Sequence, residues 1–231
     1  MHAIARKDSD AVKRGSRFGQ KGAPRAKFPG LFQPDSPDPR ERILAVARTL
    51  FAEFGFNGTS IRDITKAAGV NLGAVGYYFA TKELLYIHIL QSIVGPLAPR
   101  IEWCMRGADI PPLTRIERAV RAVFVHIRAN PDMPAYMMRE MTTGLPPSAP
   151  IAMTLGRILP AMAKVIAEGQ ARGEIRPGDP MLYVISTIAQ PVHLYLARNA
   201  ISAVTGINLD EAHDRIVDHA VNVVHGGLAA T

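Results

Sequence analysis

The sequence has very little of several features that mark other classes of protein. It holds one cysteine, Cys104, among 231 residues, which excludes an internal disulfide and fits the reducing cytoplasm. No uninterrupted apolar run approaches the roughly 18 residues that cross a membrane. The positively charged N-terminus lacks the apolar segment of a signal peptide. We therefore expect a cytoplasmic protein that does not enter a membrane.

Motifs for catalysis and for metal binding are also missing. The sequence has no HxxxH or CxxC spacing, no cluster of carboxylates and no phosphate-binding glycine loop. It shows no Ser/His/Asp motif that would support nucleophilic catalysis. A redox sensor would rest on Cys104 alone. These absences predict a protein without cofactor, metal or enzymatic activity.

The positive charge of the chain is concentrated at its N-terminal end. Residues 1–36 carry eight Lys or Arg and three Asp, a net charge of +5 out of the +7 of the whole chain. Few apolar residues and no periodicity occur there, so we expect a basic, disordered tail. One interpretation is a merely solvated extension. The other is an arm that follows DNA phosphates or enters a minor groove.

A first helix is predicted directly after the tail. Asp38 can cap it, and Pro39 suits its first turn. Apolar residues then recur on one face, and Gly55 is expected to end the helix. The stripe consists of Ile43, Leu44, Ala47, Leu50, Phe51 and Phe54.

Two short helices joined by a tight turn are predicted next. Ser60 and Asp63 have the spacing of a capping box. Gly69 lies where the chain must turn, because glycine adopts a left-handed conformation without steric cost. Asn71 can cap the second helix, which runs to Phe79. A short helix, a glycine turn and a second helix is the unit that lays its second helix in the DNA major groove.

The same stretch resembles the DNA-binding domain of the TetR family of bacterial transcriptional regulators. The residues that carry the resemblance, in order and spacing, are Thr59, Ile64, Ala68, Gly69, Val70, Gly73, Tyr78, Phe79, Lys82, Glu83 and Leu85. The resemblance implies an all-α fold, in which a three-helix DNA-binding domain precedes a larger helical domain for ligand binding and dimerisation. We therefore divide the chain into a tail (1–36), a helix-turn-helix domain (37–97) and an effector-binding and dimerisation domain (98–231).

The surface expected to contact DNA follows from this pattern. Val75 and Phe79 should point into the small core, which leaves the rest of the second helix for the groove. The expected DNA-binding residues are Ser60, Asn71, Leu72, Gly73, Ala74, Gly76, Tyr77, Tyr78 and Lys82. Asn can bond adenine edges, and Ala and Leu can contact thymine methyl groups. Tyr hydroxyls and the Lys82 ammonium can bind phosphate.

Two features of this surface limit direct base recognition. Gly76 stands where an aromatic residue is usual in the family, and the presented face offers no Arg or Gln. DNA shape is therefore expected to supply part of the specificity. The alternative for Tyr77 and Tyr78 is ordinary packing in the core.

From about residue 98 the chain shows helix signals and no strand signals. The helix predicted at 181–199 is apolar on nearly all sides, and the last helix is predicted at 209–228. A helix that is apolar all round must be buried all round. The family resemblance implies that these two helices form a homodimer interface. The alternative is that both close a monomeric core.

An effector pocket would lie among the helices of this second domain. The candidate lining residues are Trp103, Met105, Phe124, His126, Met137, Met138, Met141, Tyr183, Gln190 and His193. Methionine adapts to varied ligands, although methionines at helical spacing also fill cores. The two histidines can equally be packed or surface residues.

The sequence thus predicts a transcriptional regulator, most simply a repressor that a small, largely apolar effector releases from a palindromic operator. The alternative is a DNA-binding regulator without a small-molecule effector, either constitutive or controlled by a protein partner. An enzyme is the third class, and it lacks a catalytic motif.

Overall fold

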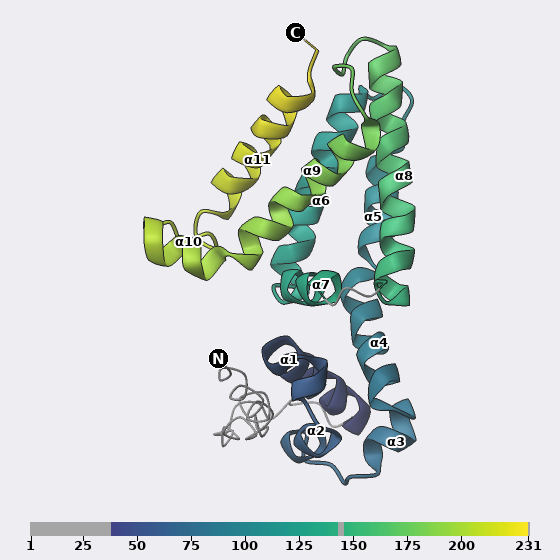
Figure 1. The fold of residues 1–231 in the computed structure, drawn as a ribbon, viewed down its shortest axis with the longest axis vertical. Coiled ribbons are helices and arrows are strands. Elements are labelled where there is room, and N and C mark those ends of the chain that lie inside the picture. Colours follow the sequence, from purple (N-terminus) through teal and green to yellow (C-terminus); the bar gives the residue numbers. More distant parts are fainter. Residues whose placement is uncertain (1–37, 143–145, 231) are drawn as a thin grey trace, which may run out of the picture. The chain divides into compact units, whose positions relative to one another are not determined.

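The computed structural model of the protein describes residues 38–142 and 146–230, which belong to one compact unit. The tail predicted at 1–36 lies outside the described residues. Helices account for the architecture, and no strand occurs in these two ranges (Figure 1). The helices are α1 (Pro39–Gly58), α2 (Ile61–Ala67), α3 (Ala74–Phe79), α4 (Lys82–Val94), α5 (Leu97–Cys104), α6 (Pro112–Ala129), α7 (Met133–Thr142), α8 (Ala149–Ala171), α9 (Pro180–Leu196), α10 (Arg198–Thr205) and α11 (His213–Leu228).

The fold predicted from the sequence is confirmed. Three helices, α1 to α3, form the N-terminal part with its helix-turn-helix, and the larger helical part follows. We call residues 38–97 the DNA-binding region. Its boundary with the second region, residues 98–230, stays a prediction, because both belong to the same compact unit.

Local capping explains where the first helices begin. The Asp38 carboxylate accepts a hydrogen bond from the backbone of Arg40 at 2.8 Å. Ser60 and Asp63 form the predicted capping box at the start of α2. The Thr81 hydroxyl accepts from the backbone N–H of Leu84 at 3.1 Å and caps α4. These side chains satisfy N–H groups that have no partner inside the helix.

Two local predictions in this region are wrong. Gly55, with φ 75° and ψ 173°, makes a kink instead of an end, and α1 continues to Gly58. Asn71 does not cap α3, which starts at Ala74 with Gly73 as its N-cap and without a side-chain hydrogen bond. The chain therefore makes an additional turn between Gly69 and α3.

The core of the DNA-binding region combines aliphatic and aromatic side chains. Ile64, Val75 and Leu85 are fully buried, one from each of α2, α3 and α4. The Phe51 ring stacks near Phe56, with centroids 5.9 Å apart. Burial of this apolar surface fixes the helix-turn-helix on α1 and α4.

The second region is built around α6, which packs against α5, α8, α9 and α11. One face of α6 carries an apolar stripe that is buried in the core: Ile116, Ala119, Val120, Val123, Phe124 and Ile127. This helix also touches the DNA-binding region through the end of α4, as described below.

The C-terminal helices differ from the ranges predicted at 181–199 and 209–228. α9 ends at Leu196, and a separate helix, α10, follows at Arg198–Thr205. α11 begins at His213, after a turn. Leu182 and Ile185 on α9 are 62% and 49% exposed, so α9 is not buried on all sides within one chain.

Two helical stretches in the described part of the chain are long and apolar enough to cross a membrane by length and composition. They cover Lys82–Cys104 and Ala149–Ala171. The first consists of α4 and α5, separated by a turn, and both of these helices pack against α8, which is the second stretch. Mutual packing within the helical core accounts for this apolar character.

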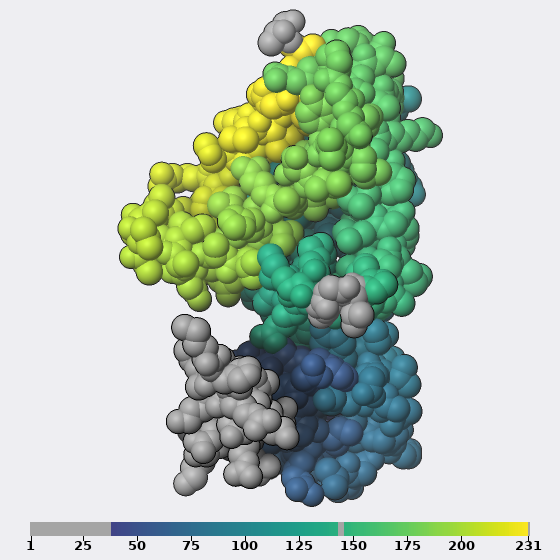
Figure 2. Space-filling view, viewed as in Figure 1, coloured from purple at the N-terminus to yellow at the C-terminus, as the bar shows by residue number. Residues whose placement is uncertain are grey.

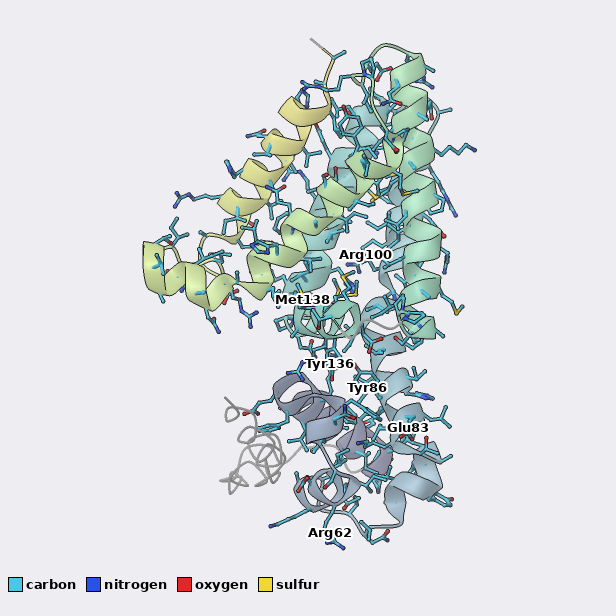
Figure 3. All side chains as sticks on the ribbon, viewed as in Figure 1. Arg62, Glu83, Tyr86, Arg100, Tyr136 and Met138 are labelled. Atoms are coloured by element: carbon cyan, nitrogen blue, oxygen red, sulfur yellow. The ribbon has the colours of Figure 1, made fainter. Side chains whose placement is uncertain are left out.

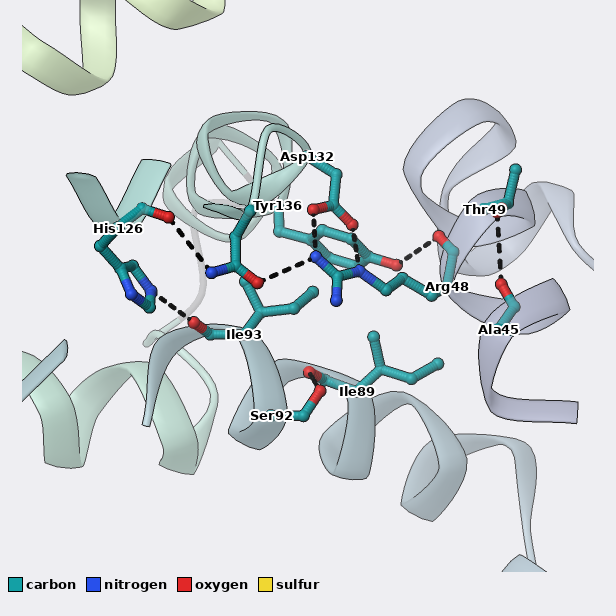
Figure 4. A network of polar contacts seen from close by, with 10 residues as sticks. Ala45, Arg48, Thr49, Ile89, Ser92, Ile93, His126, Asp132 and Tyr136 are labelled. Carbon is teal, nitrogen blue, oxygen red and sulfur yellow. Dashed lines mark hydrogen bonds and ion pairs between the residues drawn. The ribbon is translucent and has the colours of Figure 1, made fainter. Parts of the chain in front are cut away.

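A buried histidine joins α6 to α4. His126 is 2% exposed, and its Nε2–H donates to the carbonyl oxygen of Ile93 at 2.7 Å. The Asn130 amide donates to the His126 carbonyl at 3.1 Å (Figure 4). Burial lowers the pKa of His126 despite the opposing effect of the bond to Ile93. The neutral imidazole is therefore the form that fits this place.

We predict that the His126 imidazole makes folding stability fall in mild acid. Its folded pKa lies below the unfolded value of about 6.5, so the unfolded chain takes up the proton first. The contribution of this group is complete above about pH 6.5 and is lost as pH falls through the folded pKa. The free energy of unfolding in urea, measured across this range, should therefore decline with acid.

The matched control is His126→Gln, which can still donate to the Ile93 carbonyl but does not titrate. The difference between wild type and variant isolates this group from the other histidines. An identical pH dependence in both proteins would contradict the prediction.

Candidate functional site

The structure leaves much of the predicted DNA-contacting surface open. Leu72 is 56% exposed and Tyr77 is 83% exposed. Asn71, Gly73 and Gly76 are exposed as well. No residue from 71 to 79 carries a charge. The open face of α3 and of the turn before it therefore offers apolar contacts, one amide and a tyrosine hydroxyl.

Two expected DNA-contacting residues are not on this open face. Ala74 is 8% exposed and packs in the core with Val75, because α3 starts at Ala74 and directs its first residues inward. Tyr78 is half-buried, and its ring meets the Tyr77 ring edge-on, with centroids 4.9 Å apart. Tyr78 thus packs against the side of the Tyr77 ring that faces the protein.

Ser60 is exposed, but its hydroxyl is engaged in the capping box. It accepts from the backbone N–H of Asp63 at 3.1 Å and donates to the Asp63 carboxylate at 2.5 Å. The residue therefore fixes the start of α2, the helix that crosses the DNA backbone in helix-turn-helix proteins.

Lys82 has a role that the sequence did not indicate. Its ammonium donates to the carbonyl oxygens of Phe56 at 3.0 Å and of Thr59 at 3.1 Å. It also lies 4.1 Å from the centre of the Phe56 ring. The side chain thus ties the start of α4 to the end of α1. Since an ammonium has three donors, one N–H remains for another acceptor.

Exposed cations near this surface were not among the predicted residues. Arg62 and Lys66 of α2 are both exposed, and Arg62 extends away from the domain (Figure 3). The sequence could have indicated these two residues, because α2 is the first helix of a helix-turn-helix and that helix crosses the DNA backbone. Arg40, in contrast, lies over the Phe79 ring, 5.3 Å from its centre.

A small cavity of about 30 Å³ lies in the second region, where it meets the end of α4. Its lining comes from α4, α5, α6, α7, α8 and α9: Val94, Leu97, Val123, Met133, Met137, Ile151, Thr154, Leu155, Ile158, Ile188 and Val192. All of these side chains are apolar except that of Thr154. The cavity therefore suits a neutral, apolar group.

Of the ten residues expected to line an effector pocket, only Met137 lines this cavity. The others are distributed around the second region: Trp103, Met138, Met141 and His193 are exposed, Tyr183 and Gln190 are half-buried, and Met105, Phe124 and His126 are buried elsewhere in the core. The aliphatic residues that do line the cavity have no distinctive sequence signal, since they resemble ordinary core residues.

Helix α7 touches both the cavity and the DNA-binding region. Met133 and Met137, one turn apart, line the cavity. On another face, the Tyr136 hydroxyl donates to the Arg48 carbonyl of α1 at 2.8 Å. Arg139 donates to the Ala52 carbonyl of α1, also at 2.8 Å. This helix is therefore in direct contact with the helix that supports the helix-turn-helix.

A bidentate ion pair strengthens the contact between the two regions. Arg48 donates from Nε and Nη2 to the two carboxylate oxygens of Asp132 at 2.6 and 2.5 Å, and from Nη2 to Asn130 at 3.1 Å (Figure 4). Asp132 raises the pKa of Arg48 above its ordinary value. Nearby, the rings of Tyr86 and Tyr136 lie with centroids 5.9 Å apart (Figure 3). Arg48 is thus engaged within the protein.

The sequence is similar to known families and to individual proteins with known roles. Residues 43–89 match the family described as bacterial regulatory proteins, tetR family, and residues 112–224 match the tetracyclin repressor-like C-terminal domain. The chain is 29% identical over 197 residues to the HTH-type transcriptional regulator RutR of Escherichia coli K12, covering 82% of this chain and 90% of RutR. It is 28% identical over 142 residues to the HTH-type transcriptional repressor DhaR of a Mycobacterium species, covering 59% and 70%.

Solved structures share the fold. A regulatory protein of the tetR family from Rhodococcus RHA1 superposes with a TM-score of 0.68 at 19% identity, over 85% of this chain and 100% of the other. The ketosteroid transcriptional regulator KstR2 of Mycobacterium tuberculosis superposes with a TM-score of 0.64 at 20% identity, over 85% and 97%. With the two family matches and the helix-turn-helix, these likenesses show that the chain belongs to the TetR family of transcriptional regulators, whose members bind DNA and act as dimers.

Proposed function

We propose that this protein is a cytoplasmic, sequence-specific repressor that binds a palindromic operator as a homodimer and is released by a small, largely apolar effector. The observation that carries the proposal is the open face of α3. Tyr77 is a large, exposed side chain on α3, the element that enters the major groove in helix-turn-helix proteins, and Leu72 is exposed in the turn directly before it. Exposed apolar groups gathered on one element mark a binding surface.

The chemistry of this face determines what it can recognise. Asn71 can form two hydrogen bonds with an adenine edge, and Leu72 can pack on a thymine methyl group. The Tyr77 hydroxyl can donate to a phosphate, and Gly76 allows the backbone to approach closely. Because no Arg or Gln is presented, sequence-dependent DNA shape supplies the remaining specificity.

The homodimer is proposed to form through α9 and α11. Met181, Leu182 and Ile185 expose apolar surface on α9, and Val223 does so on α11. The two helices contact each other, and Figure 2 shows α9 to α11 as one continuous band of surface. The opposite faces, including Val184 and Val221, already close the core of one chain. A second copy would place two recognition helices about one helical turn of DNA apart.

The effector is proposed to bind at the cavity beside α7. The cavity of about 30 Å³ is far below the roughly 300–1,000 Å³ of ligand pockets, so an effector must push the surrounding helices apart. An apolar lining with one hydroxyl, that of Thr154, favours a neutral molecule that is largely apolar. A charged group would lose its hydration without compensation.

Helix α7 is proposed to carry the signal to the DNA-binding region. An effector that displaces Met133 and Met137 would move α7, and the bonds from Tyr136 and Arg139 would transmit that movement to α1. The distance between the two recognition helices would then change, so that both no longer fit successive major grooves. This is a rigid-body route between two packed arrangements.

A regulator without a small-molecule effector is the second candidate, and the small volume of the cavity favours it. Such a protein would act constitutively or under the control of a protein partner. The two candidates differ in one measurable respect, which is whether a small neutral compound binds the protein and releases DNA.

We predict that DNA selected by the protein from a random pool is palindromic and binds two subunits. Tyr77→Ala should weaken binding to this duplex on the order of tenfold, because it removes the hydroxyl proposed to donate to a phosphate, and a hydrogen bond to a charged group contributes about 1.5–3 kcal/mol. Trp103→Ala is the matched control, since Trp103 is also an exposed aromatic residue, 66% accessible, but lies on α5. Equal losses in both variants would place the DNA-contacting surface elsewhere.

A second prediction separates the effector candidates. A screen of neutral apolar compounds should find ones that raise the melting temperature of the wild type and release the selected duplex. Val123→Leu fills about one methylene of the cavity and should abolish both effects. Val125→Leu adds the same group on α6 at a residue that is 55% exposed and should respond like the wild type. If no compound acts on the wild type, the effector-free regulator is correct.

A third prediction concerns Lys82. Lys82→Met keeps the aliphatic stem but removes the bonds to Phe56 and Thr59, so unfolding free energy should fall by about 2 kcal/mol. DNA affinity should fall on all sequences alike, since α4 would lose its tie to α1. Lys66→Met, an exposed lysine on α2, should leave the melting temperature unchanged. A stable Lys82→Met protein with weak DNA binding would instead show a pure phosphate contact.

A further inference from the structure

The DNA-binding region is short of positive charge for its task. Residues 38–97 contain six basic and five acidic residues, a net charge of +1. The basic residues are Arg40, Arg42, Arg48, Arg62, Lys66 and Lys82. Neutralisation of phosphates supplies a large share of protein–DNA affinity, and a net charge of +1 provides little of it.

Half of these cations are engaged inside the protein. Arg42 Nε donates to the Ala68 carbonyl at 3.1 Å, Arg48 binds Asp132, and Lys82 donates to two carbonyls. The recognition helix has no charge at all. Arg62 and Lys66 are the exposed cations of α2, and a homodimer would present four such side chains, fewer than the six to ten phosphate contacts of well-studied DNA-binding proteins.

The missing charge is present in the same chain. Residues 1–36 hold eight of its 27 Lys and Arg residues, all between positions 6 and 27, with a net charge of +5. A homodimer would therefore carry two such segments.

The point where this segment joins the fold lies beside the helix-turn-helix. Asp38 caps α1, and Arg42, one turn later, bonds to Ala68, the C-cap of α2 directly before the turn to α3. Arg40 lies over the ring of Phe79 at the end of α3. Lys27 lies eleven positions before Asp38, a distance along the chain that spans at most about 40 Å. Tethering at this place gives the basic segment a high effective concentration at bound DNA.

We propose that residues 1–36 bind backbone phosphates flanking the site that α3 contacts, and that they supply most of the electrostatic part of DNA affinity. The partner is double-stranded DNA, recognised by its charge and not by its bases. The proposal rests on the DNA-binding function proposed above and adds a second contact to it, separate from α3.

The test uses full-length protein with four basic residues of the segment changed to Gln: Arg14, Arg17, Lys21 and Arg25. The control variant has the same net charge and carries the Gln changes at exposed residues of the second region outside α9 and α11: Arg100, Arg106, Arg118 and Lys164. Affinity for the selected palindrome and for a scrambled duplex is measured over a range of salt concentrations.

The slope of log affinity against log salt should become shallower in the tail variant by about 0.9 for each lost phosphate contact, up to about 3.6 per subunit. Affinity should fall by the same factor on both duplexes, so the ratio between them stays constant. The control variant should keep the wild-type slope. A wild-type slope in the tail variant would overturn the proposal.

The affinity ratio and the salt slope test the tail contact and the proposed repressor function independently of each other. The ratio of affinities for the two duplexes reports on α3, and the salt slope reports on the tail. A wild-type protein with no preference for the palindrome would overturn the specific-repressor function, while a difference in slope between the two variants would still support the tail contact. Equal slopes with an intact preference would overturn the tail contact alone.

Discussion

The bidentate pair between Arg48 and Asp132 fixes how the two regions of this protein meet. Arg48 belongs to α1, on which the helix-turn-helix packs, and Asp132 lies directly before α7, which lines the cavity. The planar guanidinium fits a carboxylate in one orientation, so the pair defines geometry as well as energy. Tyr136 and Arg139 add bonds from α7 to carbonyls of α1. A movement of α7 therefore cannot leave α1 unaffected.

The small size of the cavity constrains the regulation proposed above. A ligand shifts an equilibrium only by its difference in affinity for the two states. Ligand pockets usually span about 300–1,000 Å³, so a cavity of about 30 Å³ favours a state in which the helices stand further apart as the one that the proposed effector binds. Opening requires the separation of well-packed aliphatic side chains such as Ile158 and Val123, which costs buried contact. The proposed effector must recover that cost through its own apolar surface, which explains why a small polar molecule would fail.

Local features were predictable from the sequence, and contacts between distant residues were not. Asp38, Ser60 and Thr81 act within three residues of themselves, so their capping roles could be recognised directly. Lys82 bonds to carbonyls 23 and 26 residues away, and no periodicity indicates such a contact. The pocket prediction selected adaptable or polar side chains, whereas the cavity is lined by residues typical of any core. Ala74 lies between these two cases. Its helix was predicted correctly, but α3 begins later than predicted, so Ala74 faces the core and not the groove.

If residues 1–36 bind phosphates as proposed, the distribution of charge would separate affinity from specificity in this protein. The face of α3 is uncharged, so the base contacts proposed for it would release no counterions and would depend little on salt. The basic residues of the chain's first 36 positions would respond to salt and not to sequence. The discrimination between operator and other DNA would then stay constant while occupancy rises and falls with ionic conditions.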